Sequence, residues 1–260
     1  MVALAAVTYA LTAAGGGESW IAGGIGVAAA VGFVLRQRAA ATPLVPLRLF
    51  SDRTFTTSNL MTFLVYGAMG AVFFMLALQL QISVGWSPLI AGVATLPVTL
   101  ALMLLSSRAG ALSQRIGPRI PMTVGPLLCA VGVALLSGIG PGTTYVRGVL
   151  PGLTLFALGL ALLVAPLTAT VLAAAPQTMS GTASGVNNAV ARAGSLLAVA
   201  ALPAVVGLSG RAYADPVALT AAHHAAMLWC AAALGLGGVI SWFGLPGPGT
   251  PGGAASDARP

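Results

Sequence analysis

Charge is the scarcest property of this sequence. Charged residues make up 6% of its 260 residues, against about 25% in an average soluble protein. Only four of them are acidic: Glu18, Asp52, Asp215 and Asp257. A soluble globular protein is therefore excluded. A disordered chain is excluded as well, because disorder combines high charge with low hydrophobicity, whereas 58% of this chain is hydrophobic. The composition therefore indicates an integral membrane protein.

Lysine is absent, and all eleven cations are arginines. This excludes a P-loop, a pyridoxal Schiff base and the strand lysine of protein kinases. Two cysteines make neither a disulfide framework nor a zinc site, and the adjacent His223 and His224 would point about 100° apart on a helix, so they cannot chelate one ion together. The net charge of +7 is not interleaved with aromatic residues, as it is in nucleic-acid-binding segments. We therefore expect no metal, no cofactor, no nucleic-acid partner and no enzymatic activity.

Long apolar runs are abundant, and a helical span needs about 20 apolar residues. The runs cover residues 2–14, 20–35, 55–80, 89–106, 120–139, 149–174, 186–208 and 220–243. None alternates in polarity as a barrel strand does. They predict an all-α integral membrane protein, a polytopic helical bundle with eight crossings.

The first run is too short for a full crossing. A signal peptide is one interpretation, but no basic region precedes the apolar residues. We favour the second half of a spanning helix whose start is missing. The predicted organisation is a partial span and a full span over 1–36, a cytoplasmic loop over 37–54, a six-helix bundle over 55–243 and a disordered cytoplasmic tail over 244–260.

Arginine positions predict the orientation, because cytoplasmic loops are rich in arginine. With a cytoplasmic N-terminus and eight crossings, the outer side holds only Arg147 and Arg211. The cytoplasmic side holds the other nine: Arg36, Arg38, Arg48, Arg53, Arg108, Arg115, Arg119, Arg192 and Arg259. Both termini are therefore expected in the cytoplasm.

A polar stripe marks the run at 55–80. Asn59, Tyr66 and Phe73 recur every seven residues and share one helix face, with Thr62 and Gln81 close to that line. Polar groups in hydrocarbon need either partners on other helices or a wet cavity. Both interpretations stay open: helix–helix hydrogen bonds, or a substrate cavity to which the run at 149–174 would add Thr154 and Thr168.

The segment from Gly110 to Arg119 resembles the signature loop of the major facilitator superfamily, which reads roughly G-x-L-a-D-R-x-G-x-[RK]. Gly110, Leu112, Arg115, Gly117 and Arg119 match it, and Gln114 replaces the aspartate. This places any charge relay through that position in question.

Three further stretches resemble the fourteen-span drug:proton antiporters of that superfamily (EmrB/QacA type). Residues 43–50 with Arg53 resemble the loop before their C-terminal bundle, and Gln81 with residues 85–92 resembles their next outer turn. Residues 181–188 with Arg192 and Gly194 resemble the inner loop before their penultimate helix. The resemblance assigns the cytoplasmic gating loops to Gly110, Arg115, Gly117, Arg119, Ser184, Asn187, Asn188 and Arg192.

The resemblance implies the C-terminal half of such a transporter, preceded by two linker helices, in the cell membrane. The expected activity is multidrug efflux by proton antiport and alternating access. The expected partners are the lipid bilayer, a missing N-terminal six-helix bundle, a proton and a small amphipathic or cationic drug-like substrate. Two alternatives stay open: a non-transport scaffold or accessory subunit, and a half-transporter that works as a dimer.

Overall fold

The computed structural model describes residues 2–12, 17–39 and 47–247. Every regular element in these ranges is helical. Six of the described helices are long and apolar enough to span a membrane: Arg53–Ser83, Pro88–Ile116, Arg119–Leu136, Tyr145–Ala173, Gln177–Val205 and Pro216–Gly244. The predicted all-α polytopic membrane bundle is therefore confirmed.

The spans consist of long α-helices with short helical extensions. The long helices are α3 (Arg53–Leu78), α5 (Leu96–Ile116), α6 (Arg119–Leu136), α7 (Leu150–Ala173), α8 (Ser180–Val205) and α9 (Pro216–Gly244). A shorter helix, α4 (Pro88–Ala94), precedes α5, and π-helical turns η2 (Gln79–Ser83) and η3 (Tyr145–Val149) follow α3 and precede α7. The 3₁₀ turns are η1 (Leu47–Ser51), η4 (Gln177–Met179) and η5 (Gly210–Ala214).

Local sequence sets the helix starts. The Asp52 carboxylate accepts a hydrogen bond from the Phe55 amide (2.8 Å) and caps α3. The Asp215 carboxylate accepts one from the Val217 amide (2.9 Å) and caps α9. Acidic caps satisfy amides that the first helical turn leaves unbonded, and they favour the positive end of the helix dipole.

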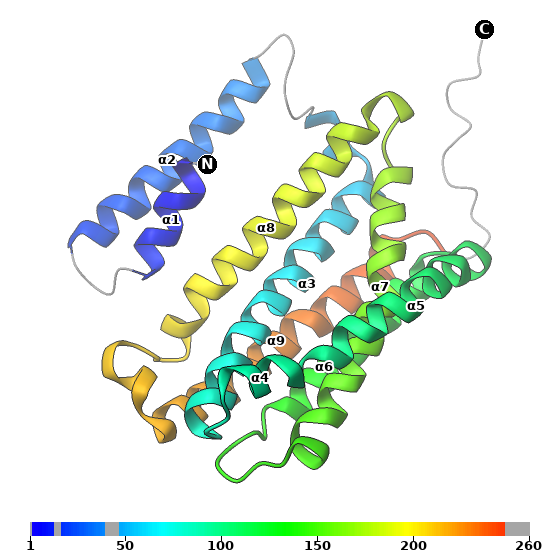
Figure 1. The fold of residues 1–260 in the computed structure, drawn as a ribbon. Helices are drawn as coiled ribbons and strands as arrows, with labels where there is room; N and C mark the ends of the chain where they lie inside the picture. Colours follow the sequence, from blue (N-terminus) through cyan, green and yellow to red (C-terminus); the bar gives the residue numbers. More distant parts are fainter. Residues whose placement is uncertain (1, 13–16, 40–46, 248–260) are drawn as a thin grey trace, which may run out of the picture.

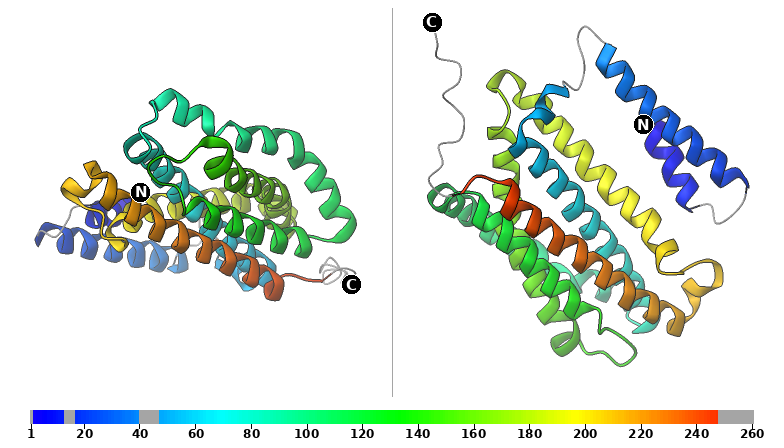
Figure 2. Two further views of the ribbon diagram at one scale, coloured as in Figure 1. Left: turned by 90° about the horizontal axis from the view of Figure 1, so that it is seen from below. Right: turned by 180° about the vertical axis from the view of Figure 1, so that it is seen from behind.

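Helix α3 lies at the centre of the bundle. It packs between α8 and α9, and α6 joins α9 to α7, against which α5 packs (Figure 1). The views in Figure 2 show the same neighbours from below and behind. One end of the bundle gathers η1, the start of α3, the turn between α5 and α6, and the end of α9. Because Arg48, Arg53, Arg115 and Arg119 lie there, we call it the arginine-rich end.

Two helices lie outside the six-span bundle. Helix α1 (Val2–Thr12) packs against α2 (Gly17–Ala39) and against α8, so the pair flanks α8 on the side away from α3 (Figure 1). With 11 residues, α1 is about 16 Å long, which is shorter than the hydrocarbon core. Helix α2 is not among the helices that meet the length and apolarity needed to span. A crossing by α2 therefore stays a prediction.

Glycine lets α6 and α7 approach closely. A Cβ added at Gly132 would come within 2.5 Å of the Phe156 nitrogen and 2.6 Å of the Gly152 oxygen. One added at Gly159 would come within 2.5 Å of the Gly125 oxygen. Small residues at such crossings bring the backbones of membrane helices together. Among the described glycines, Gly132 and Gly159 come closest to the backbone atoms of a neighbouring helix.

Two segments that we expected to be loops are largely helical. Gly110 and Arg115 lie within α5, and Ser184, Asn187, Asn188 and Arg192 lie within α8. The polar composition of residues 180–188 is typical of a loop. Here it forms the first turns of α8, and one of its polar side chains, Asn187, contacts Thr62 of α3. Only Gly117 and Pro118 separate α5 from α6, and Gly117 turns the chain at φ +82°.

Part of the predicted organisation falls outside the described residues. The loop predicted at 37–54 has residues 40–46 outside them, and the tail predicted at 244–260 has residues 248–260 outside. Within the rest of that loop, residues 37–39 end α2 and residues 47–51 form η1.

Candidate functional site

A small pocket lies between α3, α7 and α8. Its volume is about 90 Å³. The lining residues are Tyr66, Thr168, Val171, Leu172, Ser184, Asn187, Asn188 and Ala191. Tyr66 and Thr168 come from the predicted cavity, whereas Ser184, Asn187 and Asn188 come from the predicted gating loop. The fold brings these two sets together because the supposed loop is a helix beside α3.

A polar contact between α3 and α8 holds one wall of this pocket. The hydroxyl of the fully buried Thr62 lies 2.7 Å from Asn187 Oδ1 and 2.9 Å from the Ser58 carbonyl oxygen. Asn59 is also buried, and its amide nitrogen donates to the Phe55 carbonyl (2.9 Å). Its Oδ1 atom has no hydrogen-bond partner among the described residues. The α3 stripe thus contains both a helix–helix bond and one open buried acceptor.

Tyr66 and Thr168 are the only predicted cavity residues that line this pocket, and Asn59, Thr62, Phe73, Gln81 and Thr154 do not. Phe73 is half-buried and meets Phe156 of α7 edge-on, with ring centroids 6.0 Å apart. Thr154 is exposed and donates to the Leu150 carbonyl (2.7 Å), and Gln81 is exposed on η2. A helical threonine that bonds the carbonyl four residues earlier needs no partner on another helix. Spacing along the helix therefore grouped residues that the bundle separates.

At the arginine-rich end of the bundle, two arginine side chains contact the last turn of α9. Arg53 donates to the Phe243 carbonyl oxygen (2.7 Å). The Arg119 guanidinium lies 4.1 Å from the centroid of the Trp242 ring, a cation–π contact. Cations are also favoured at the C-terminal end of a helix dipole. Of the predicted gating residues, Arg119 therefore has an observed role in joining α6 to α9.

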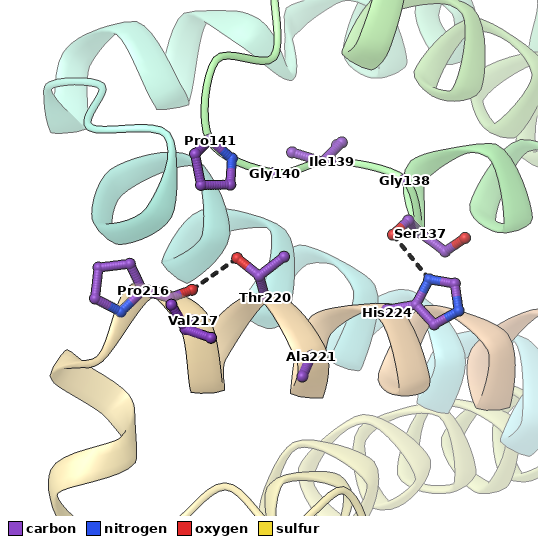
Figure 3. A pocket seen from close by; sticks show the side chains of 10 residues that line it. All are labelled: Ser137, Gly138, Ile139, Gly140, Pro141, Pro216, Val217, Thr220, Ala221 and His224. Carbon is purple, nitrogen blue, oxygen red and sulfur yellow. Dashed lines mark hydrogen bonds between the residues drawn. The ribbon is translucent and has the colours of Figure 1, made fainter.

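A larger hollow lies at the opposite end of the bundle (Figure 3). Its volume is about 630 Å³. It is lined by Ser137, Gly138, Ile139, Gly140, Pro141, Pro216, Val217, Thr220, Ala221 and His224. The hollow is wide open and lined mainly by apolar and small residues, so it offers little to orient a ligand.

The polar groups beside this hollow bind the last carbonyls of α6. His223 is buried with Nε2 2.9 Å from the Leu136 oxygen, and His224 Nδ1 lies 3.2 Å from the Ser137 oxygen. The buried Gln79 amide donates to the Ile139 oxygen (2.8 Å) and to Thr220 Oγ1 (3.0 Å). These residues close the end of α6, which leaves carbonyls unbonded within the helix. In the sequence, these residues stand out only as a histidine pair and a glutamine at the ends of apolar runs.

Titratable groups that could hold a metal are scarce. Within the described residues, no cluster of three or more His, Cys, Asp or Glu side chains has the arrangement of a metal site. Cys129 and Cys230 are buried as free thiols in α6 and α9. The pocket between α3, α7 and α8, with its phenol, hydroxyls and amides, is therefore the site that the geometry favours.

Comparison with known proteins identifies the family. Residues 1–199 match the sequence profile of the Major Facilitator Superfamily. The chain is 30% identical over 198 residues to the multidrug efflux pump LfrA of Mycolicibacterium smegmatis, covering 75% of this chain and 39% of LfrA. It is 32% identical over 209 residues to the quinolone resistance protein NorB of Staphylococcus aureus, covering 78% and 43%. It is also 32% identical over 181 residues to the multidrug resistance protein Stp of Mycobacterium tuberculosis, covering 68% and 33%.

The chain thus spans less than half the length of these relatives. The profile match takes in the two helices before residue 43 as well as most of the bundle. Together with six apolar helices able to cross a bilayer, this makes the protein a multi-pass protein of the plasma membrane. The chain belongs to the major facilitator superfamily.

Proposed function

We propose that this chain supplies the C-terminal half of a multidrug efflux transporter of the fourteen-span drug:proton antiporter branch. Its relatives LfrA, Stp and NorB carry drug efflux or resistance in their names. In such a transporter two helical bundles rock about a site near the middle of the membrane and expose it to each side in turn. The six-helix bundle described above would be one of the two.

The observation that carries this proposal is the pocket between α3, α7 and α8. It presents one aromatic ring, Tyr66, beside the amides of Asn187 and Asn188 and the hydroxyls of Thr168 and Ser184. A volume of about 90 Å³ is small for a drug-sized ligand, since ligand sites usually enclose about 300–1,000 Å³. A second bundle facing it would enlarge and close the cavity. Aromatic and polar groups in an apolar wall suit an amphipathic or cationic substrate.

Proton coupling in this proposal depends on a group outside the six spans. None of the spans contains Asp or Glu, since Asp52 and Asp215 cap α3 and α9 from just outside them. A membrane-embedded acid is the usual proton carrier of a transporter. We therefore assign the coupling acid to the second bundle, and the cytoplasmic face to the arginine-rich end, with both termini on that side.

Replacement of Tyr66 tests the site. In the complete transporter, Tyr66→Ala should reduce efflux of an aromatic cation such as ethidium by about 2- to 30-fold, because a tyrosine ring holds a cation by about 0.5–2 kcal/mol. Tyr66→Phe, which keeps the ring, should retain most of the efflux. Efflux is measured as loss of dye fluorescence from cells that lack their own pumps.

Leu60→Ala is the matched control. Leu60 is an exposed residue of α3 and does not line the pocket. It should leave efflux close to that of the unmodified protein. Equal losses at Leu60 and Tyr66, at equal expression, would mean general damage to α3 and would contradict a substrate contact at Tyr66.

A further inference from the structure

Arg192 lies near the middle of a spanning helix. It follows the first residue of α8 by twelve positions and precedes the last by thirteen. At a rise of 1.5 Å per residue, α8 is about 39 Å long, and Arg192 lies about 18 Å from the end of α8 that is at the arginine-rich end of the bundle. The sequence suggested a cytoplasmic loop here, and the structure replaces that interpretation with mid-helix depth.

The contact between α8 and α3 gives the same depth independently. A Cβ added at Gly194 would lie 2.6 Å from the Phe63 oxygen, and one added at Gly67 would lie 3.2 Å from the Gly194 oxygen. Phe63 and Gly67 belong to the central turns of α3, which begins at Arg53 beside the end of α9. Arg192 is thus too far from the bundle end for its side chain to reach headgroups by snorkelling.

The face that carries Arg192 is not covered by the described chain. Arg192 is exposed, and so are Asn188 and Leu196, one turn to either side. No hydrogen bond, ion pair or aromatic contact to Arg192 is present among the described residues. A charged side chain at this depth is costly against lipid and is normally found paired or in a wet cavity inside a bundle.

We propose that Arg192 binds a carboxylate carried at mid-membrane depth by a transmembrane helix that packs on the Asn188–Leu196 face of α8. The inference rests on the proposed function, because the second bundle of the transporter would supply that helix. Charge complementarity favours such a helix over a second copy of this chain or a lipid headgroup. A second copy of this chain has no acid in its six spans, and lipid phosphates lie at the membrane surface rather than at this depth.

The position of the pair relative to the pocket adds a function for it. Two residues that line the pocket adjoin Arg192 on α8. Ala191 is its neighbour in the chain, and Asn188 lies one turn earlier. A carboxylate held by Arg192 would therefore lie at the edge of the substrate site. Binding of a proton to that carboxylate would neutralise it and release the guanidinium. Among the residues that line the pocket, Tyr66 is the one with a titratable side chain, and Arg192 adjoins the lining without being part of it.

Photo-crosslinking in the native host tests the occupant. A benzophenone amino acid at Leu196 keeps Arg192 intact and samples the same face one turn away. We expect a crosslink to a transmembrane peptide that contains Asp or Glu within a turn of the attachment point. The same probe at Trp229, an exposed residue of α9, should react with lipid. A lipid adduct at Leu196, or a peptide without an acid, would overturn the proposal.

Carbodiimide labelling tests the charge pair. Dicyclohexylcarbodiimide modifies protonated carboxyl groups in the membrane. An arginine within about 4–6 Å lowers the pKa of a carboxyl group by about 1–3 and so keeps it ionised. Arg192→Gln should therefore raise labelling of the partner acid about tenfold for each unit lost. Arg192→Lys should label like the unmodified protein, and so should the control Leu196→Gln.

Unchanged labelling in Arg192→Gln would contradict a carboxylate on a partner helix. Labelling that is blocked only when a small anionic substrate is added would contradict it as well. If Arg192→Gln does not accumulate, the crosslink from Leu196 decides by itself. Neither readout requires transport. A correct crosslink in a protein without drug efflux would therefore leave this pair standing and count against the proposed function alone.

Discussion

Buried amides show what determines the role of a polar residue in this bundle. Gln79 and Gln81 lie two residues apart on η2, yet Gln79 is fully buried and Gln81 is exposed. The sequence pointed to Gln81, because it falls close to the polar stripe of the preceding run. Gln79 is bonded to the Ile139 carbonyl and to Thr220, partners that the period of a single helix does not reveal. The stripe therefore selects the wrong neighbour.

Replacing Gln79 should destabilise the bundle. Gln79→Leu removes the donor to the Ile139 carbonyl and to Thr220, so a buried acceptor loses its partner. The expected cost is about 1–3 kcal/mol of unfolding free energy. It is measured by denaturant titration of the purified protein in mild detergent, followed by tryptophan fluorescence.

Gln81→Leu serves as the control and should change stability by less than about 0.5 kcal/mol, as exposed substitutions usually do. Equal effects from the two substitutions would show that the hydrogen bonds of Gln79 do not stabilise the end of α6.

Single residues of the candidate site were partly predictable. Tyr66 and Thr168 were selected because polar groups in an apolar run need either a partner or a cavity, and both line the pocket. The pairing of Thr62 with Asn187 was not predictable, because no sequence period gives the register between α3 and α8. That register follows from Gly67 and Gly194, whose missing side chains let the helices meet.

At the scale of elements, apolar run length predicts the helices well. The runs at 55–80 and 149–174 fall within two residues of α3 and α7. The run at 186–208 misses the first six residues of α8, where Ser180, Thr182 and Ser184 interrupt the apolar pattern. Pro126, Pro166 and Pro203 lie inside helices, whereas the run containing Pro97 breaks between α4 and α5 at Thr95.

The glycines between α6 and α7 should be intolerant of even a methyl group. Gly132→Ala would place its Cβ against the backbone of Phe156 and Gly152, where no flexible side chain can move aside. Overpacking of this kind costs about 1–3 kcal/mol. The loss should appear as a lower melting temperature of the detergent-solubilised protein, measured by fluorescence-detected size exclusion.

Gly235→Ala in α9 provides the comparison, because nothing lies within 4 Å of a Cβ built there. It should be neutral or slightly stabilising, since alanine favours the helix over glycine by about 1 kcal/mol. A melting temperature that falls equally in both variants would contradict close backbone packing of α6 against α7.

At the scale of the whole molecule, the uneven distribution of arginines predicts the orientation. The end of α5 and the turn after α6 lie at opposite ends of the bundle (Figure 1). Gln114→Cys and Thr144→Cys place exposed thiols at these two ends, while Cys129 and Cys230 are buried and contribute little background. In intact cells, a membrane-impermeant maleimide should label position 144 and leave position 114 unlabelled.

Permeabilised cells supply the control, because both positions should then react. Labelling of position 114 in intact cells would reverse the proposed orientation. Labelling of both positions in intact cells would contradict the crossing of α6, which separates them.

The shape of the molecule also bears on the proposed mechanism. Helices α5 and α8 have few buried residues along their length compared with α3 and α7. Two sparsely buried helices, a partly formed pocket and an unpaired arginine at mid-depth are what one half of a two-bundle transporter would show. A complete alternating-access cavity needs a second wall, which we assign to a second bundle.

The most direct test of this account is transport by the purified chain. Reconstituted in proteoliposomes with an imposed pH gradient, the 260-residue chain alone should not move ethidium, in monomeric or oligomeric fractions. The six spans contain no acid to carry the proton, and one bundle encloses only part of the site. Co-reconstitution with the N-terminal bundle of the transporter should restore pH-driven efflux. Robust pH-driven efflux by the chain alone would contradict the account and indicate a half-transporter that works as a dimer.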